Sequence, residues 1–231
     1  MALDRSHAFG GCSVYSKPAY FMWLYKYFLK HMVRLNISER IKSLKVWMQF
    51  CNNATISDKV CLGPNAWCIN GRKEPENIVL KEGVVCRGLL RTEIFGKGKI
   101  IIHSDVYIGD DCLISSANHI EIGAHSLIAH GVQIFDNDTH PVSAKDRDLD
   151  WYAIKTGNYE LKPEIKGKPI KIGESVWIGF NSIIMKGVSV GNRSVIAAGS
   201  VVVTDVPPDV LVAGNPAKII KDLTGLSEEK K

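Results

Sequence analysis

The sequence predicts an all-β solenoid over residues 56 to 215, and three regularities predict it. An isoleucine or valine recurs at every sixth position, except for a skip of two residues between Ile114 and Ile122 and a long break after Ile134. A compact residue often follows four positions later, and a glycine often follows directly. A helix would repeat its apolar face about every 3.6 residues, and a strand alternates its side chains every two. Stacked coils of short strands joined by tight corners fit a period of six, so we expect a parallel β-helix. The aliphatic positions are Ile102, Ile108, Ile114, Ile122, Ile128, Ile134, Ile172, Ile178, Ile184, Val190, Ile196 and Val202.

Glycines directly follow several of these aliphatic residues, namely Gly109, Gly123, Gly173, Gly179 and Gly191. We expect them to supply corner dihedrals that a Cβ would oppose. A less regular form of the repeat extends back through residues 56–90, which places the start of the solenoid near residue 56.

Residues 1–55 predict an N-terminal helical region. Tyr20, Trp23, Leu24 and Tyr27 follow three- and four-residue spacing, and a second helical stretch begins at Ser38 and runs to Phe50. We expect this region to cap the solenoid. Two alternatives stay open: the aromatic and basic face of residues 19–50 lies peripherally on a membrane surface, or it binds a partner.

The bulk composition bounds the class of protein. A chain of 231 residues fits one domain with a small appendage. The net charge of +5 without a block of like charges argues against nucleic-acid binding. The six cysteines lack metal-type spacing and are interpreted as free thiols of a reducing compartment. No signal peptide or membrane span is recognised, so we expect a cytoplasmic protein.

The repeat stops after Ile134 and resumes at Ile172, which predicts an inserted loop over residues 136–170. Long loops in compact domains are usually functional. This one carries Trp151, Tyr152 and Tyr159 among charged residues, a composition that suits stacking on a sugar face. We therefore expect the loop to form part of an acceptor site or its lid.

A family resemblance rests on residues 167–223, which include GESVWIGFNSIIMKG and AGNPAK, and on the motif DNDTHP. These residues resemble the hexapeptide-repeat acetyltransferases, in the branch of maltose, galactoside and polysaccharide O-acetyltransferases. The resemblance implies a left-handed β-helix and a homotrimer with active sites between subunits. It also implies a short C-terminal helix that begins at Ala217 to Leu223, within a terminal segment of residues 216–231.

The resemblance makes His140 of DNDTHP the catalytic residue. Histidine suits a general base because its ordinary pKa lies near neutrality. No cysteine or serine has a recognisable nucleophile setting, so we expect direct transfer from acetyl-CoA, the co-substrate, in a ternary complex without a metal.

The resemblance also places a cofactor site on the last coils. Phe180 would present its backbone N–H to the thioester, and two lysines would lie near the phosphates of CoA, although an ordinary solvated face explains the lysines as well. The cofactor candidates are Phe180, Ala198, Gly199, Val203, Thr204, Lys218 and Lys221.

Polar and aromatic residues near the break are the acceptor candidates. Asp111 stands where relatives often have an asparagine, and Trp177 could equally be a packed aromatic. The substrate-binding candidates are Asp111, Asp136, Asn137, Asp138, Trp151, Tyr152 and Trp177.

The predicted function is transfer of acetyl to a hydroxyl of a sugar or surface-polysaccharide precursor. One alternative acceptor is an amine on an amino-sugar nucleotide. Another reading is a metal-dependent hydratase of the carbonic anhydrase type, in which His125 and His130 bind the metal with His103 or His119. A non-catalytic solenoid is the last alternative.

Overall fold

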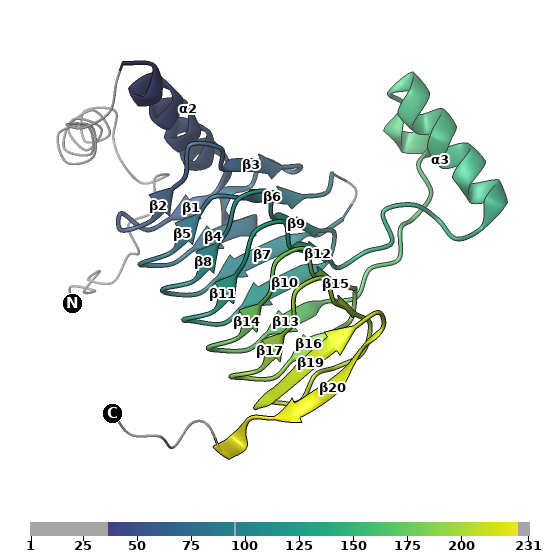
Figure 1. The fold of residues 1–231 in the computed structure, drawn as a ribbon. Helices are drawn as coiled ribbons and strands as arrows, with labels where there is room; N and C mark the ends of the chain where they lie inside the picture. Colours follow the sequence, from purple (N-terminus) through teal and green to yellow (C-terminus); the bar gives the residue numbers. More distant parts are fainter. Residues whose placement is uncertain (1–36, 95, 226–231) are drawn as a thin grey trace, which may run out of the picture.

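The computed structural model describes residues 37–94 and 96–225, which form a three-sided solenoid (Figure 1). The chain passes in turn through three sheets, A, B and C, whose neighbouring strands come from successive coils. All pairings are parallel except the last one in sheet B. The predicted left-handed parallel β-helix is confirmed.

The strands are short, and each sheet takes one strand from nearly every coil. Sheet A contains, in order, β1 (Thr55–Ile56), β4 (Ile78–Leu80), β7 (Lys99–Ile102), β10 (His119–Ile122), β13 (Ile170–Ile172) and β16 (Ser189–Val190). Sheet B contains β2 (Cys61–Leu62), β5 (Val85–Cys86), β8 (Tyr107–Ile108), β11 (Leu127–Ile128), β14 (Trp177–Ile178), β17 (Val195–Ile196), β19 (Val210–Gly214) and β20 (Ala217–Asp222). Sheet C contains β3 (Trp67–Asn70), β6 (Leu89–Thr92), β9 (Leu113–Ser116), β12 (Gln133–Phe135), β15 (Ile183–Ile184) and β18 (Val201–Val202). A 3-10 turn, η2 (Pro75–Asn77), precedes β4.

The six-residue period forms the core. In sheet C, Ile114 pairs with Ile134, and Ile134 pairs with Ile184, so the same side chain stacks from coil to coil. All three are 0% exposed. Full burial of one such side chain stabilises a fold by roughly 1.5–3 kcal/mol, and the repeated ladder therefore provides much of the stability.

The repeat glycines have a different role from the one expected. At the described corners, positive φ angles belong to polar residues such as Asp105 (58°) and His125 (59°), and to glycines outside this set, such as Gly131 (72°) and Gly199 (69°). The repeat glycines are required by close approach instead, because a Cβ on Gly123 would lie 2.5 Å from the carbonyl carbon of Gly173 in the next coil. The expectation that they supply special corner dihedrals is wrong.

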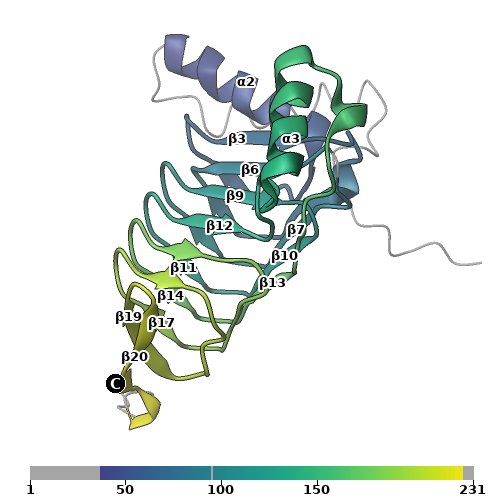
Figure 2. The same ribbon diagram turned by 90° about the vertical axis from the view of Figure 1, so that its right-hand side faces the viewer.

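Helix α2 (Ile37–Asn53) covers the N-terminal end of the solenoid (Figures 1 and 2). Its side chains Val46, Trp47 and Phe50 are buried in the core, which confirms the predicted helix up to Phe50 and supports its role as a cap. The first expected helical stretch, with Tyr20 and Trp23, lies outside the described residues. Within the described part of the chain, no helix is long and apolar enough to cross a membrane.

The expected C-terminal helix at Ala217 to Leu223 is wrong, because residues Ala217–Asp222 form strand β20. β20 turns back after β19 and pairs with it in antiparallel fashion, so it covers the edge of β19 and becomes the last strand of sheet B. An open edge presents unpaired backbone groups that favour strand addition, and Ile219 and Ile220 favour extended structure.

The insertion leaves between β12 and β13 and is partly helical. It contains α3 (Ala144–Thr156) and a 3-10 turn, η3 (Tyr159–Leu161). The hydroxyl of Ser143 accepts a hydrogen bond from the Asp146 N–H at the start of α3, and Gly157 ends the helix in the left-handed conformation. Figures 1 and 2 show α3 projecting from the side of the solenoid.

We expect the substitution Gly123→Ala to lower the free energy of unfolding by about 2 kcal/mol or more, because the new Cβ meets backbone that cannot move freely. Denaturant unfolding at fixed protein concentration measures the loss. Gly225→Ala is the matched control, since no atom lies within 4 Å of its added Cβ. Equal stability of the two variants would contradict the close-packing explanation.

Candidate active site

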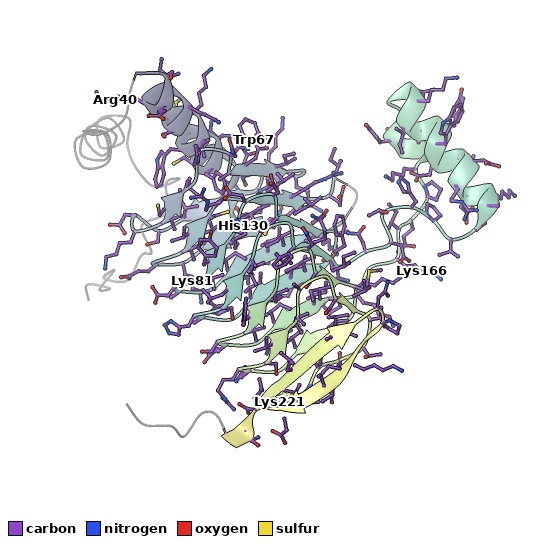
Figure 3. All side chains as sticks on the ribbon, in the orientation of Figure 1. Arg40, Trp67, Lys81, His130, Lys166 and Lys221 are labelled. Atoms are coloured by element: carbon purple, nitrogen blue, oxygen red, sulfur yellow. The ribbon has the colours of Figure 1, made fainter. Side chains whose placement is uncertain are left out.

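The base of the insertion is a pair of antiparallel segments. Asn137 and Gly167 form a β-bridge, the Asp138 N–H donates to the Lys166 carbonyl at 3.2 Å, and the Lys168 N–H donates to the Asp136 carbonyl at 2.8 Å. Figure 3 labels Lys166 on this base, between the coils and α3. Farther out, the main packing partner of α3 is η3, so the outer part of the insertion packs largely on itself.

His140 lies where the outgoing segment turns toward α3. Thr139 has a φ of 60°, and the His140 N–H donates to the Asp138 carbonyl at 2.6 Å. The imidazole is 58% exposed, and its Nδ1 lies 2.6 Å from Oδ2 of Asp150 on α3. One ring nitrogen is therefore held by a carboxylate, while much of the ring remains open to a ligand.

Asp150 is only 1% exposed, and its other oxygen, Oδ1, lies 3.3 Å from Nζ of Lys162. Burial opposes ionisation of this carboxyl, but the hydrogen bond with His140 and the charge of Lys162 outweigh it. They hold the pKa of Asp150 below its ordinary value. Neither Asp150 nor Lys162 was among the sequence candidates. The capping preferences of Ser143 and Gly157 would have allowed α3 to be predicted from the sequence. They do not indicate which face of the helix turns toward His140.

Asp136 and Asn137 are buried at the base of the insertion, with 0% and 3% exposure. The Asp136 carboxylate accepts from the N–H groups of Ala117 (2.7 Å) and Asn118 (2.9 Å), from the Ser116 hydroxyl (2.6 Å), and from the Asn137 side chain (3.1 Å). These bonds indicate a structural role for Asp136 at the base of the insertion, and the acceptor contact expected for Asp136 and Asn137 stays a prediction.

The other two acidic candidates lie apart from each other. Asp138 forms an ion pair with Lys186 of the following coil, which fastens the insertion to the solenoid. Asp111 is an exposed corner residue between β8 and β9, with a φ of 58°. It lies at the corner between sheets B and C, whereas the insertion leaves the corner between sheets C and A.

A cavity of about 570 Å³ lies beside the returning segment, and we call it the insertion cavity. Glu93, Lys97 and Asn118 line it from the preceding coils, and Lys162 and Glu164 line it from the insertion. Because Lys162 also contacts Asp150, the cavity adjoins the group that holds His140.

The aromatic candidates of α3 are exposed. Trp151 and Tyr152 have 61% and 51% of their surface accessible, and Nζ of Lys155 lies 4.9 Å from the centroid of the Trp151 ring. In a single chain they are available to a ligand or to another subunit.

The cofactor candidates divide into three groups. Phe180, Ala198 and Gly199 meet at the corner between sheets B and C, where the Gly199 N–H donates to the Phe180 carbonyl at 2.9 Å. Trp177 precedes this corner and is 54% exposed. The remaining candidates are Val203 and Thr204, directly after β18, and Lys218 and Lys221, exposed on β20 (Figure 3 labels Lys221).

One chain does not bring His140 to this cofactor corner. The corner with Phe180 precedes the sheet C strand of its coil, whereas the corner with the insertion follows the sheet C strand. The two groups therefore flank sheet C on opposite sides.

The histidines of the hydratase interpretation also lie apart. His125 lies 3.8 Å from Asp105 at the corner between sheets A and B. His130, labelled in Figure 3, accepts from the Asp110 N–H at the corner between sheets B and C, and His103 pairs with Glu121 in sheet A. In the region that the structure describes, no three histidine, cysteine, aspartate or glutamate side chains gather as metal ligands.

We expect Asp136→Ala to lower the free energy of unfolding by about 2 kcal/mol or more, because it leaves the buried N–H groups of Ala117 and Asn118 without their acceptor. The Ser116 hydroxyl keeps a second acceptor, the Lys99 carbonyl at 3.1 Å. Thermal unfolding and limited proteolysis of the insertion measure this loss of stability. If the variant kept wild-type stability and lost only affinity for an acceptor, the structural role would be refuted.

Comparisons with known proteins agree with this architecture. A family model described as "Bacterial transferase hexapeptide (six repeats)" matches residues 169–204. A relative from Escherichia coli (strain K12), provisionally named a lipopolysaccharide biosynthesis O-acetyl transferase, is 32% identical over 135 residues, which cover 57% of this chain and 65% of the relative. The chain spans less than two thirds of the length of the first curated relatives that it matches.

Two solved structures extend the similarity over most of the chain. A polySia specific acetyltransferase is 30% identical with a TM-score of 0.54, covering 72% of this chain and 70% of its own. A hexapeptide-repeat acetyltransferase from Vibrio cholerae O1 biovar eltor, complexed with acetyl coenzyme A, is 27% identical with a TM-score of 0.51, covering 88% and 86%. The chain therefore belongs to the hexapeptide-repeat acetyltransferase family.

Proposed function

We propose that the protein is an acetyl-CoA-dependent O-acetyltransferase that acts on a hydroxyl of a sugar or surface-polysaccharide precursor. The observation that carries this proposal is the exposed imidazole of His140, held at Nδ1 by the buried carboxylate of Asp150. This arrangement leaves Nε2 as the basic nitrogen toward an acceptor.

The reaction transfers the acetyl group directly. His140 Nε2 takes the proton of the acceptor hydroxyl while its oxygen bonds to the thioester carbonyl carbon. The carbon–sulfur bond of the tetrahedral intermediate then breaks, and the sulfur leaves as a thiol with the proton from His140. The backbone N–H of Phe180 is our candidate for stabilising the intermediate's oxygen, because a fixed donor at a rigid corner needs no reorganisation.

Two of the buried thiols are poorly suited to forming an acyl-enzyme, which supports direct transfer. Burial raises the pKa of Cys86 to about 12 and that of Cys112 to about 11. Both thiols are therefore protonated at neutral pH, and only the thiolate is a strong nucleophile.

The separation of His140 from the cofactor corner supports a site shared between chains. The outer face of sheet B offers an apolar stripe for association, with Leu127 at 51% and Trp177 at 54% exposure. The stripe follows the strand register from Tyr107 through Leu127, Trp177 and Val195 to Leu211. We propose a homotrimer in which the insertion of one chain meets the cofactor corner of the next.

The insertion cavity supports a hydroxylated acceptor. Its lining offers the amide of Asn118 and the charged groups of Glu93 and Lys97 as hydrogen-bonding partners. On α3, Trp151 and Tyr152 expose aromatic faces of the kind that stack on sugars. The same base could take a proton from an amine, so N-acetylation of an amino-sugar nucleotide is the alternative outcome of an acceptor screen.

We expect His140→Ala to lower kcat by roughly 10²–10⁴-fold, the usual contribution of a general base. Thiol release from acetyl-CoA, measured across sugars, amino sugars and nucleotide sugars, gives the rate and the acceptor. Sedimentation should show the same trimer in wild type and variant, because the exposed imidazole lies on the insertion. Wild-type turnover in the variant would refute the base assignment, and acetylation of amines alone would select the alternative.

We expect Lys218→Ala to weaken the binding of acetyl-CoA more than that of dephospho-CoA, by about 1.4-fold to fivefold at low salt, because an exposed cation contributes about 0.2–1 kcal/mol and salt screens it. Calorimetric titration at two ionic strengths measures both affinities, and Lys145→Ala on α3 is the control. Identical losses for the two ligands would contradict contact with the phosphate.

A further inference from the structure

We infer that Asp150 and Lys162 are positioning residues for His140. Asp150 sets the tautomer and orientation of the imidazole, and Lys162 offsets the charge of Asp150 so that the imidazole remains a neutral base. This inference rests on the proposed function, because it gives His140 the role of base.

The geometry of Asp150 is that of a fixed acceptor. Its two oxygens have separate partners, with Oδ2 at 2.6 Å from Nδ1 of His140 and Oδ1 at 3.3 Å from Nζ of Lys162. Its side chain is 2% exposed and that of Lys162 is 9% exposed, so water competes little for either group. Arg147, one turn before Asp150, donates to the carbonyl of Pro141 at 3.4 Å and also to that of Val142. These bonds connect α3 to the segment that carries His140.

An ionised carboxylate can only accept hydrogen bonds. Asp150 therefore requires the proton of a neutral imidazole to lie on Nδ1, which leaves the lone pair on Nε2. When His140 takes the acceptor's proton on Nε2, the nearby carboxylate stabilises the imidazolium that forms.

A carboxylate without a counter-charge would favour the imidazolium even before substrate binds, and an imidazolium cannot act as a base. Lys162 places a positive charge on the other oxygen of Asp150 and reduces this bias. The other charged groups around His140 are engaged elsewhere, since Asp138 pairs with Lys186 and Arg147 bonds to backbone carbonyls. The charge that faces Nδ1 of His140 is therefore that of the Asp150 carboxylate, with Lys162 on the other oxygen of that carboxylate.

The first test of this inference is Asp150→Asn in the full chain. The asparagine amide can donate to Nδ1, so we expect the neutral His140 ring to change from the Nδ1–H to the Nε2–H tautomer, as read from ring ¹⁵N shifts. We expect kcat to fall by about 10²-fold or more, and the KM for acetyl-CoA to stay within about threefold. Asp148→Asn, the same change at an exposed position of α3, is the matched control and should behave as wild type.

The second test is Lys162→Met. With Asp150 less compensated, the imidazolium is favoured, so the rise of kcat with pH and the ring titration of His140 should both move to higher pH by about one unit. Lys162→Arg should restore the wild-type profile, and Lys145→Met at an exposed position of α3 should leave it unchanged. Asp150→Asn should move the titration in the opposite direction.

The outcomes separate the two proposals. An unchanged tautomer and unchanged kcat in Asp150→Asn, together with loss of activity in His140→Ala, would overturn the positioning roles and leave the proposed function intact. The expected tautomer change in Asp150→Asn, together with a wild-type protein that releases no thiol with any acceptor, would overturn the proposed function instead. If circular dichroism shows that Asp150→Asn does not fold, the titrations of the His140 ring in Lys162→Met and Lys162→Arg decide whether the positioning roles hold. A His140 titration that does not move in Lys162→Met overturns the inference.

Discussion

The structure depends on the stacking of coils at a fixed spacing. Adjacent strands lie about 4.8 Å apart, so each coil must bring its aliphatic residue to the same place as the coil before it. Ile114, Ile134 and Ile184 satisfy this in sheet C although an insertion of more than thirty residues separates two of them. The same spacing excludes a Cβ at Gly123, which explains the glycines better than any need for unusual dihedrals.

An insertion is compatible with stacking only if the chain leaves and rejoins the coil at one corner. The bridge between Asn137 and Gly167 meets this condition. Asp136 adds a second connection, because its carboxylate accepts hydrogen bonds from the preceding coil at Ser116, Ala117 and Asn118. His140 is therefore attached to a part of the insertion that hydrogen bonds hold against the solenoid. The segment beyond His140 packs mainly on itself.

Much of the fold could be predicted from the sequence, because each inward position of the stacked coils needs an aliphatic side chain, whichever residues precede and follow it in the sequence. His140 could be singled out as the candidate base from its motif and from its place in the break, and that role stays a prediction. The burial of Asp136 could not be predicted from the sequence, because a polar residue in a loop is usually exposed. Asp136 is buried only because residues of the preceding coil donate hydrogen bonds to its carboxylate. The C-terminal strand was missed because the open edge that β20 covers exists only after the coils have stacked.

Helix α3 shows why Asp150 and Lys162 could not be found in the same way. The apolar side chains of Trp151, Tyr152 and Ile154 are exposed, while the buried residues of the helix are Asp150 and Ala153. Burial of an ionised carboxylate is unfavourable unless it is paired, so this orientation of the helix is stable only with His140 and Lys162 in place. The interactions that stabilise the insertion are then the same as those that orient the imidazole of His140.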